Sequence, residues 1–182
     1  SNTHGYCGAQ EGETLCGGRF SEAERWPCLL QRALGEEYLV IEEGLCGRTT
    51  VFPDPLEPGL DAISYLRPCL LSHAPVSLLI LMLGTNDTKE RFNASPACIG
   101  IGMERLAMKA ETVGAWRGGR PNILIVAPPH IGAGHNDPAM GVSCHATSMG
   151  VAEQYRQKCA AHGWAFLDAE GVAEFNTVGY MH

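Results

Sequence analysis

The sequence VSLLILMLGTND, residues 76–87, carries the strongest evidence for the fold class. Its first part is a continuous apolar run without alternation, which is typical of a parallel strand covered on both faces. Gly84 ends the run, and the polar residues Thr85, Asn86 and Asp87 follow it. In open α/β sheets ligands bind beyond the carboxyl ends of the strands. The stretch therefore predicts a central parallel strand that delivers Asn86 to a ligand site.

The segments around this run alternate between helix and strand patterns. Ser21 and Glu24 form a capping-box pattern before apolar residues at helical spacing, and Pro68 predicts a kink in a later helix. In chain order we expect a helix at 21–34, a strand at 37–44, a helix at 60–73, the strand at 76–84, a helix at 96–115, a strand at 122–129, a helix at 146–162 and a short strand at 164–171. This alternation predicts an α/β protein, a three-layer sandwich whose mostly parallel sheet is flanked by helices. We expect one domain over residues 1–182.

The composition excludes several classes of protein. Thirteen Lys and Arg against 20 Asp and Glu leave a net charge of −7, and the basic residues are scattered, which argues against a nucleic-acid partner. No apolar run reaches the length of about 20 residues that spans a bilayer, so no membrane partner is expected. Several of the eight cysteines lie in apolar runs and none forms a CxxC pair. We therefore predict reduced thiols, a cytoplasmic location and no metal site.

The ends of the predicted strands carry the residues for chemistry. The turns EEGLCGRTT, LGTNDTK and VAPPH follow three of them, and the long segment 128–144 is a candidate substrate loop. Ester hydrolysis by a serine needs a base and donors for the developing oxyanion. Ser1 is a candidate nucleophile, His182 a candidate base, and Gly47 and Asn86 are candidate oxyanion donors.

The combination resembles the SGNH, or GDSL-type, hydrolase family. SNTHGY resembles the family's first block from its serine onward, GLCGRTT the second, GTND the third and NTVGYMH the last. RWPCLLQRALGEEYLVIEEGLCGRTT and SLLILMLGTNDTK are similar to the arylesterase and acyltransferase branch, so the resemblance covers nearly the whole chain. It implies a flavodoxin-like SGNH hydrolase fold and a serine esterase for small acyl esters, acetyl or short-chain, aryl or alkyl, with acyl transfer as a further activity.

The resemblance also assigns roles to residues. Ser1 attacks the ester carbonyl and His182 accepts its proton, forming an acyl-enzyme. The oxyanion is held by the Ser1 nitrogen, the Gly47 N–H and the Asn86 side chain. No cofactor is implied, the partner is a small-molecule ester, and the branch's frequent oligomers allow a homo-oligomer.

Three departures from the family pattern qualify these roles. Gly179 occupies the position of the family acid, three residues before His182. Either the enzyme is impaired, or another carboxylate substitutes, or a serine–histidine dyad suffices. Asp168 and Asp87 are the candidate substitutes, although Asp87 is better placed to brace the loop after Asn86. The family's first strand and its last helix have no counterpart, so we expect a domain truncated at both ends.

Other interpretations remain open. A scaffold without its acid could bind acyl or sugar esters without turning them over, and a mature N-terminal Ser1 could use its own α-amino group as the base. His4, close after the nucleophile, and His130, in the long loop, are candidate substrate contacts.

Overall fold

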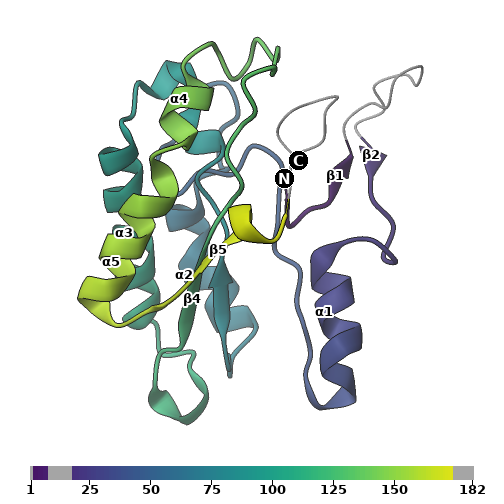
Figure 1. Ribbon diagram of the computed structural model, residues 1–182. Helices are drawn as coiled ribbons and strands as arrows, with labels where there is room; N and C mark the ends of the chain where they lie inside the picture. Colours follow the sequence, from purple (N-terminus) through teal and green to yellow (C-terminus); the bar gives the residue numbers. More distant parts are fainter. Residues whose placement is uncertain (1, 8–17, 174–182) are drawn as a thin grey trace.

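The computed structural model describes residues 2–7 and 18–173. It has an α/β fold in which helices flank a parallel sheet, as predicted; Figure 1 shows α3 and α5 on one side of this sheet and α1 on the other. The helices and strands are β1 Tyr6–Cys7, β2 Gly18–Arg19, α1 Trp26–Leu34, α2 Ala62–Ser72, β3 Leu79–Leu81, α3 Pro96–Glu111, β4 Ile123–Ala127, α4 Cys144–Ser148, α5 Val151–His162 and β5 Ala165–Asp168, with short 3₁₀ turns between them.

The parallel sheet has the strand order β3-β4-β5. Leu79 of β3 is in register with Ile123 of β4, and Ala127 at the other end of β4 is in register with Asp168 of β5. The run at 76–84 is thus a strand, but the prediction that it is central was wrong for the described residues. Only β4 pairs with it among them, so β4 holds the middle position and β3 an edge.

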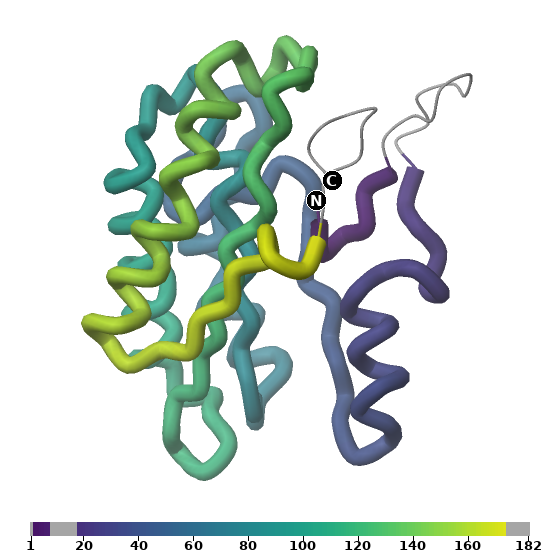
Figure 2. Tube along the Cα trace, viewed as in Figure 1, coloured from purple at the N-terminus to yellow at the C-terminus, as the bar shows by residue number. Residues whose placement is uncertain are grey.

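The prediction of a strand at 37–44 was also wrong for the described residues. The chain runs extended there but joins no ladder of the described residues, and its path beside α1 can be followed in Figure 2. Gln31 of α1 supplies the missing partners, because its side-chain amide donates to the Tyr38 carbonyl at 2.9 Å and its oxygen accepts from the Val40 N–H at 2.7 Å. A side chain thus satisfies backbone groups that a neighbouring strand would otherwise bind.

The predicted helices form, with shifted ends. Ser21 and Glu24 do bond to each other, but α1 begins at Trp26, with Pro27 in its first turn, where a proline costs no hydrogen bond. The α2 helix is capped by Asp61, which accepts from Ser64 N at 2.9 Å, and it continues through Pro68. The predicted helix at 146–162 is two helices, α4 and α5, divided at Gly150.

The core lies between the sheet and the helices α2, α3 and α5. Ile99, Met103 and Leu106 of α3 and Ile125 of β4 are fully buried in it. Two features lie outside the sequence predictions: the small antiparallel pair of β1 and β2, and the position of α3 against α5. Within residues 2–7 and 18–173 there is no helix with the length and apolar character needed to cross a membrane.

Candidate active site

A cavity of about 350 Å³ opens where the turn after β3 meets the loop after residue 44. Both Gly47 and Asn86 line it, so the structure brings these two predicted site residues together. The other lining residues are Tyr6, Cys46, Leu56, Glu57, Thr85, Lys89, Arg91, Asp137, Ala139 and Met140. The lining mixes apolar with charged side chains, as expected of a site for a small polar molecule.

Asn86 is positioned by the 3₁₀ turn η2, Asn86–Thr88. Its side-chain amide Nδ2 donates to the Arg48 carbonyl at 3.2 Å, which links the turn after β3 to the residue after Gly47. This bond fixes the orientation of the amide, and the amide nitrogen has a second N–H. A fixed amide in a cavity is the arrangement that oxyanion stabilisation needs.

Gly47 has a backbone conformation that favours glycine. Its φ is +77°, in the left-handed region. A Cβ at this position would lie 2.8 Å from Leu60 Cδ1 and 2.9 Å from Glu57 Oε2. A larger residue would therefore have to displace Leu60 and Glu57, of which Glu57 lines the cavity.

Asp87 links the turn at Asn86–Thr88 to Thr50, consistent with the bracing role expected from the sequence. It is fully buried, and its carboxylate accepts from Thr50 N at 2.9 Å and from the Thr50 hydroxyl. Burial raises the pKa of Asp87 to about 6, although the Thr50 bonds act in the opposite direction. Since this carboxylate holds Thr50, it links the turn that contains Asn86 to the segment after Gly47, and it is not among the residues that line the cavity.

An ion-pair cluster forms the charged side of the cavity. Lys89, only 5% exposed, contacts Asp54 at 3.2 Å and Glu57 at 2.9 Å, and Arg91 contacts Asp54 at 2.6 Å. The Arg91 hydrogen bonds hold the pKa of Asp54 at about 2. The sequence analysis did not predict these charged residues or Tyr6 as part of the site. The run TKER, which directly follows GTND, could have indicated Lys89 and Arg91.

The segment 128–144 contributes to the cavity, as the candidate substrate loop should. Asp137, Ala139 and Met140 line it, and the Met140 carbonyl accepts from Glu90 N at 2.8 Å. The buried Cys144 Sγ lies 2.8 Å from His135 Nε2 at the end of the same loop.

The other predicted site residues divide into two groups. Ser1, His182 and Gly179 lie outside the described residues. His4 and His130 are described but do not line this cavity: the Arg19 side chain donates to the His4 carbonyl at 2.7 Å, and His130 Nδ1 lies 2.7 Å from Glu170. Asp168, the alternative acid, pairs with Arg156 at 3.2 Å and caps the turn after β5.

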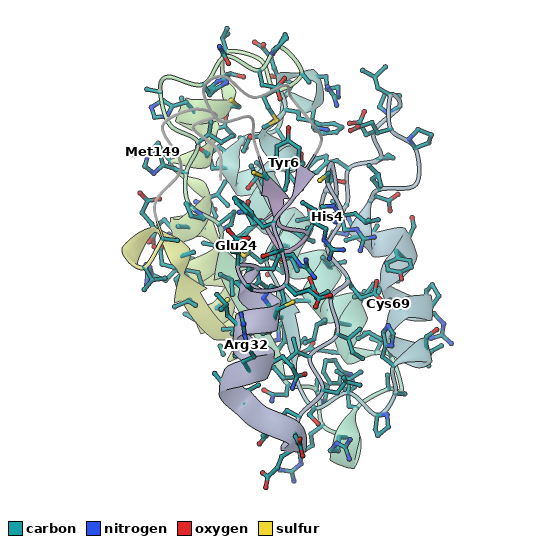
Figure 3. The ribbon with its side chains drawn as sticks, turned by 90° about the vertical axis from the view of Figure 1, so that its right-hand side faces the viewer. His4, Tyr6, Glu24, Arg32, Cys69 and Met149 are labelled. Atoms are coloured by element: carbon teal, nitrogen blue, oxygen red, sulfur yellow. The ribbon has the colours of Figure 1, made fainter. Side chains whose placement is uncertain are left out.

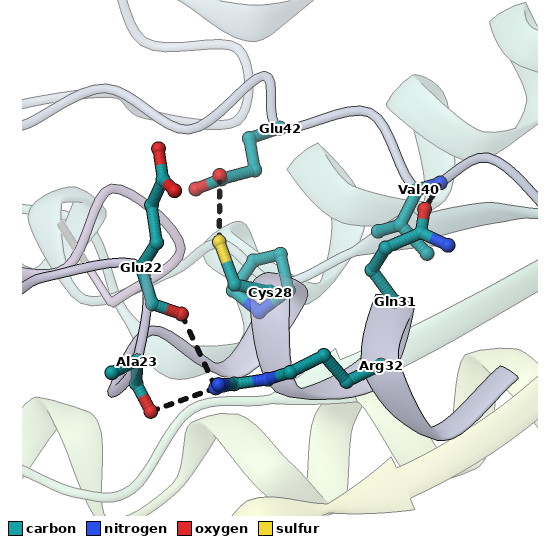
Figure 4. Close-up of a pocket in the computed structure, with 8 residues that line it drawn as sticks. Glu22, Ala23, Cys28, Gln31, Arg32, Val40 and Glu42 are labelled. Atoms are coloured by element: carbon teal, nitrogen blue, oxygen red, sulfur yellow. Dashed lines mark hydrogen bonds between the residues drawn. The ribbon is translucent and has the colours of Figure 1, made fainter. Parts of the chain in front are cut away.

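A second cavity, about 330 Å³, lies between α1 and residues 40–42 (Figure 4). Its polar groups bond to one another. The Cys28 thiol donates to Glu42 at 3.1 Å, and Arg32 donates to the carbonyls of Glu22 and Ala23. None of the residues predicted for the chemistry lines it, so the candidate site is the cavity at Gly47 and Asn86.

The fold and the family comparison define a carboxylic ester hydrolase. The chain belongs to the GDSL-like Lipase/Acylhydrolase family, which it matches over residues 1–179. Two solved structures are similar to it: the aryl esterase of M. smegmatis, 33% identical with a TM-score of 0.89, and a carbohydrate acetylesterase from Sinorhizobium meliloti, 32% identical with a TM-score of 0.89. In each case the match covers 100% of this chain and 86% of the other. The comparison with curated proteins returned no match. The resemblance inferred from the sequence is thus confirmed.

Proposed function

We propose that this protein hydrolyses small acyl esters through an acyl-enzyme, with Ser1 as nucleophile and His182 as base. Gly47 N–H and the Asn86 amide are the proposed oxyanion donors, and the same site would transfer the acyl group to an alcohol that replaces water. The best support is that Gly47 and Asn86 line one cavity. The Asn86 amide is held there by its hydrogen bond to the carbonyl of Arg48, the residue that follows Gly47.

The cavity favours a small substrate. Its volume, about 350 Å³, is near the lower end of the range for small-molecule sites, about 300–1,000 Å³. Leu56 and Met140 offer apolar contact for a short acyl or aryl group, while Glu57 and Arg91 offer bonds to hydroxyl groups. Acetyl and short-chain esters, including those of sugars, fit this lining.

The test is the hydrolysis of p-nitrophenyl acetate by the chain and by its Asn86→Ala variant. Losing one oxyanion donor lowers kcat by about 10²- to 10³-fold. The matched control is Asn122→Ala. The Asn122 side-chain amide also donates to a backbone carbonyl, that of Ser77 at 3.0 Å, but Asn122 directly precedes β4 and does not line the cavity. Equal losses in both variants would contradict the proposed role of Asn86, and activity that survives Ser1→Ala would contradict the proposed nucleophile.

A second candidate follows from Gly179, which stands where the family has its acid and cannot orient an imidazole. If no other group replaces this acid, the protein binds acyl or sugar esters but does not hydrolyse them. A ligand that raises the melting temperature while no ester is hydrolysed would favour this candidate. Activity that appears or rises in Gly179→Asp would locate the defect at the acid.

A further inference from the structure

A second cluster of chemically active side chains lies away from the cavity, where α2 meets the segment before Gly44. It consists of Glu43, Cys69 and His73, and the ligand atoms of these three residues all lie within 4.8 Å of one another. The His73 Nε2 is 2.7 Å from Glu43 Oε1. In Figure 3 Cys69 on α2 lies apart from Tyr6, which lines the candidate active site.

Two of the three side chains share one face of α2. Cys69 and His73 are four residues apart, which places them one turn from each other, and His73 N donates to the Cys69 carbonyl at 3.2 Å as in a continuing helix. They lie at the carboxyl end of the helix, where the backbone dipole favours a cation. The helix thus offers a thiol and an imidazole together at a cation-favouring position.

Glu43 completes the cluster from another part of the chain, and its carboxylate is already oriented. The Tyr65 hydroxyl, one helical turn before Cys69, donates to Glu43 Oε2 at 2.9 Å and leaves Oε1 toward His73. The nearby Arg48 donates to the Glu43 backbone carbonyl at 3.0 Å and stacks 4.7 Å from the centre of the Tyr65 ring. Arg48 therefore binds the Glu43 backbone and the Tyr65 ring.

We propose that Glu43, Cys69 and His73 form a binding site for a zinc-like divalent ion. Thiolate, imidazole and carboxylate are the ligands that zinc takes, and three of them with a fourth, open position form a recognised tetrahedral set. Ligand atoms of a tetrahedral zinc ion lie about 3.3 to 3.8 Å apart, so the cluster needs only small side-chain adjustments. Glu43 and His73 are about one-third exposed, which gives the ion access and leaves room for a water ligand. The ion would link α2 to the segment that leads to Gly47.

The test is a titration of the metal-stripped full chain with Co²⁺, whose thiolate complexes have a characteristic charge-transfer absorption. The expected result is saturation at one ion per chain with that absorption and tetrahedral visible bands, both displaced by Zn²⁺. Cys69→Ser should lose the charge-transfer band. Tyr65→Phe, which removes only the hydroxyl that orients Glu43, should weaken binding about 10-fold.

Matched controls separate this site from other thiols and imidazoles. Cys98→Ser changes an exposed thiol on α3, and His162→Gln changes a histidine that pairs with Glu104 on another surface. Both should keep the spectrum and the affinity, and circular dichroism without metal should show that every variant is folded. A thiolate band that persists in Cys69→Ser, that disappears in Cys98→Ser, or that never forms at one equivalent would overturn the proposal. Zn²⁺ should also raise the melting temperature of the parent but not that of Cys69→Ser.

Discussion

At the scale of single residues, the buried Lys89 depends on its carboxylate partners. Asp54 is almost fully buried beside it, and the second partner, Glu57, is half exposed. Removing one member of a buried pair leaves an uncompensated charge, which is far more costly than losing a surface pair. The ion-pair cluster at the cavity is therefore stabilising only while Lys89 and its carboxylate partners are all present.

We expect Asp54→Asn to lower the free energy of unfolding by about 3 kcal/mol, because Lys89 and Arg91 lose their shared carboxylate. Urea denaturation measures the loss. The control is Glu153→Gln, which breaks an exposed pair with Arg156 and should cost less than about 0.5 kcal/mol. Equal effects of the two substitutions would contradict the buried-pair argument.

The sequence predicted part of this site. Gly47 and Asn86 could be found because glycine at a turn and a polar residue after a buried strand leave local patterns. Glu57 and Tyr6 could not, because their places in the cavity depend on long-range contacts such as the Lys89–Glu57 pair. For the same reason the sequence did not indicate the cluster proposed above: Glu43 lies 2.7 Å from His73 only in the folded chain.

At the scale of elements, the glycines of α3 are explained by close packing. A Cβ on Gly100 would lie 2.8 Å from Gln154 Cβ on α5, and one on Gly102 would lie 2.7 Å from Thr50 Oγ1. Thr50 is fully buried and holds Asp87, so it has little freedom to move. The absence of a side chain at these two positions lets α3 lie close to both neighbours.

Gly102→Ala should therefore destabilise the protein although alanine is the better helix former. The helical preference contributes about 1 kcal/mol in favour of alanine, whereas overpacking costs about 1–3 kcal/mol, so we expect a net loss of about 1 kcal/mol. Gly114→Ala is the control, because among residues 2–7 and 18–173 no atom outside its chain neighbours lies within 4 Å of its Cβ position. The control should leave the melting temperature unchanged or raise it slightly. A Gly102→Ala protein as stable as the parent would contradict the packing argument and show that the Thr50 side chain moves away at little cost.

Elements were predictable where their patterns are local, and their partners were not. The apolar runs predicted β3, β4 and β5, whereas the caps of α2 and α3, Asp61 and Ser95, were identified only in the structure. Within the described part of the chain, the edge position of β3 and the lack of strand pairing at 37–44 depend on which strands meet in space. Strand propensity alone carries no information about that pairing.

At the scale of the whole molecule, stability should depend on pH through Asp87. The pKa of this buried carboxyl is raised from 3.8 to about 6, so the folded state binds its proton more tightly than the unfolded state does. The stabilising contribution is therefore complete below about pH 3.8 and is lost as the pH rises through about 6. At about 1.4 kcal/mol for each pKa unit, the loss is on the order of 3 kcal/mol.

Asp87→Asn should remove this dependence while keeping an oxygen that accepts from Thr50 N. We expect the difference in unfolding free energy between variant and parent to shift in favour of the variant by on the order of 3 kcal/mol between about pH 4 and pH 6.5. Urea denaturation at several pH values measures it, and taking the difference cancels the titration of the other carboxyls, including Asp54, whose pKa is lowered. Glu153→Gln, on the exposed surface of α5, should give a difference near zero throughout. If the Asp87→Asn difference is equally flat, Asp87 is ionised in the folded protein over the whole range, and the Thr50 hydrogen bonds rather than burial determine its charge.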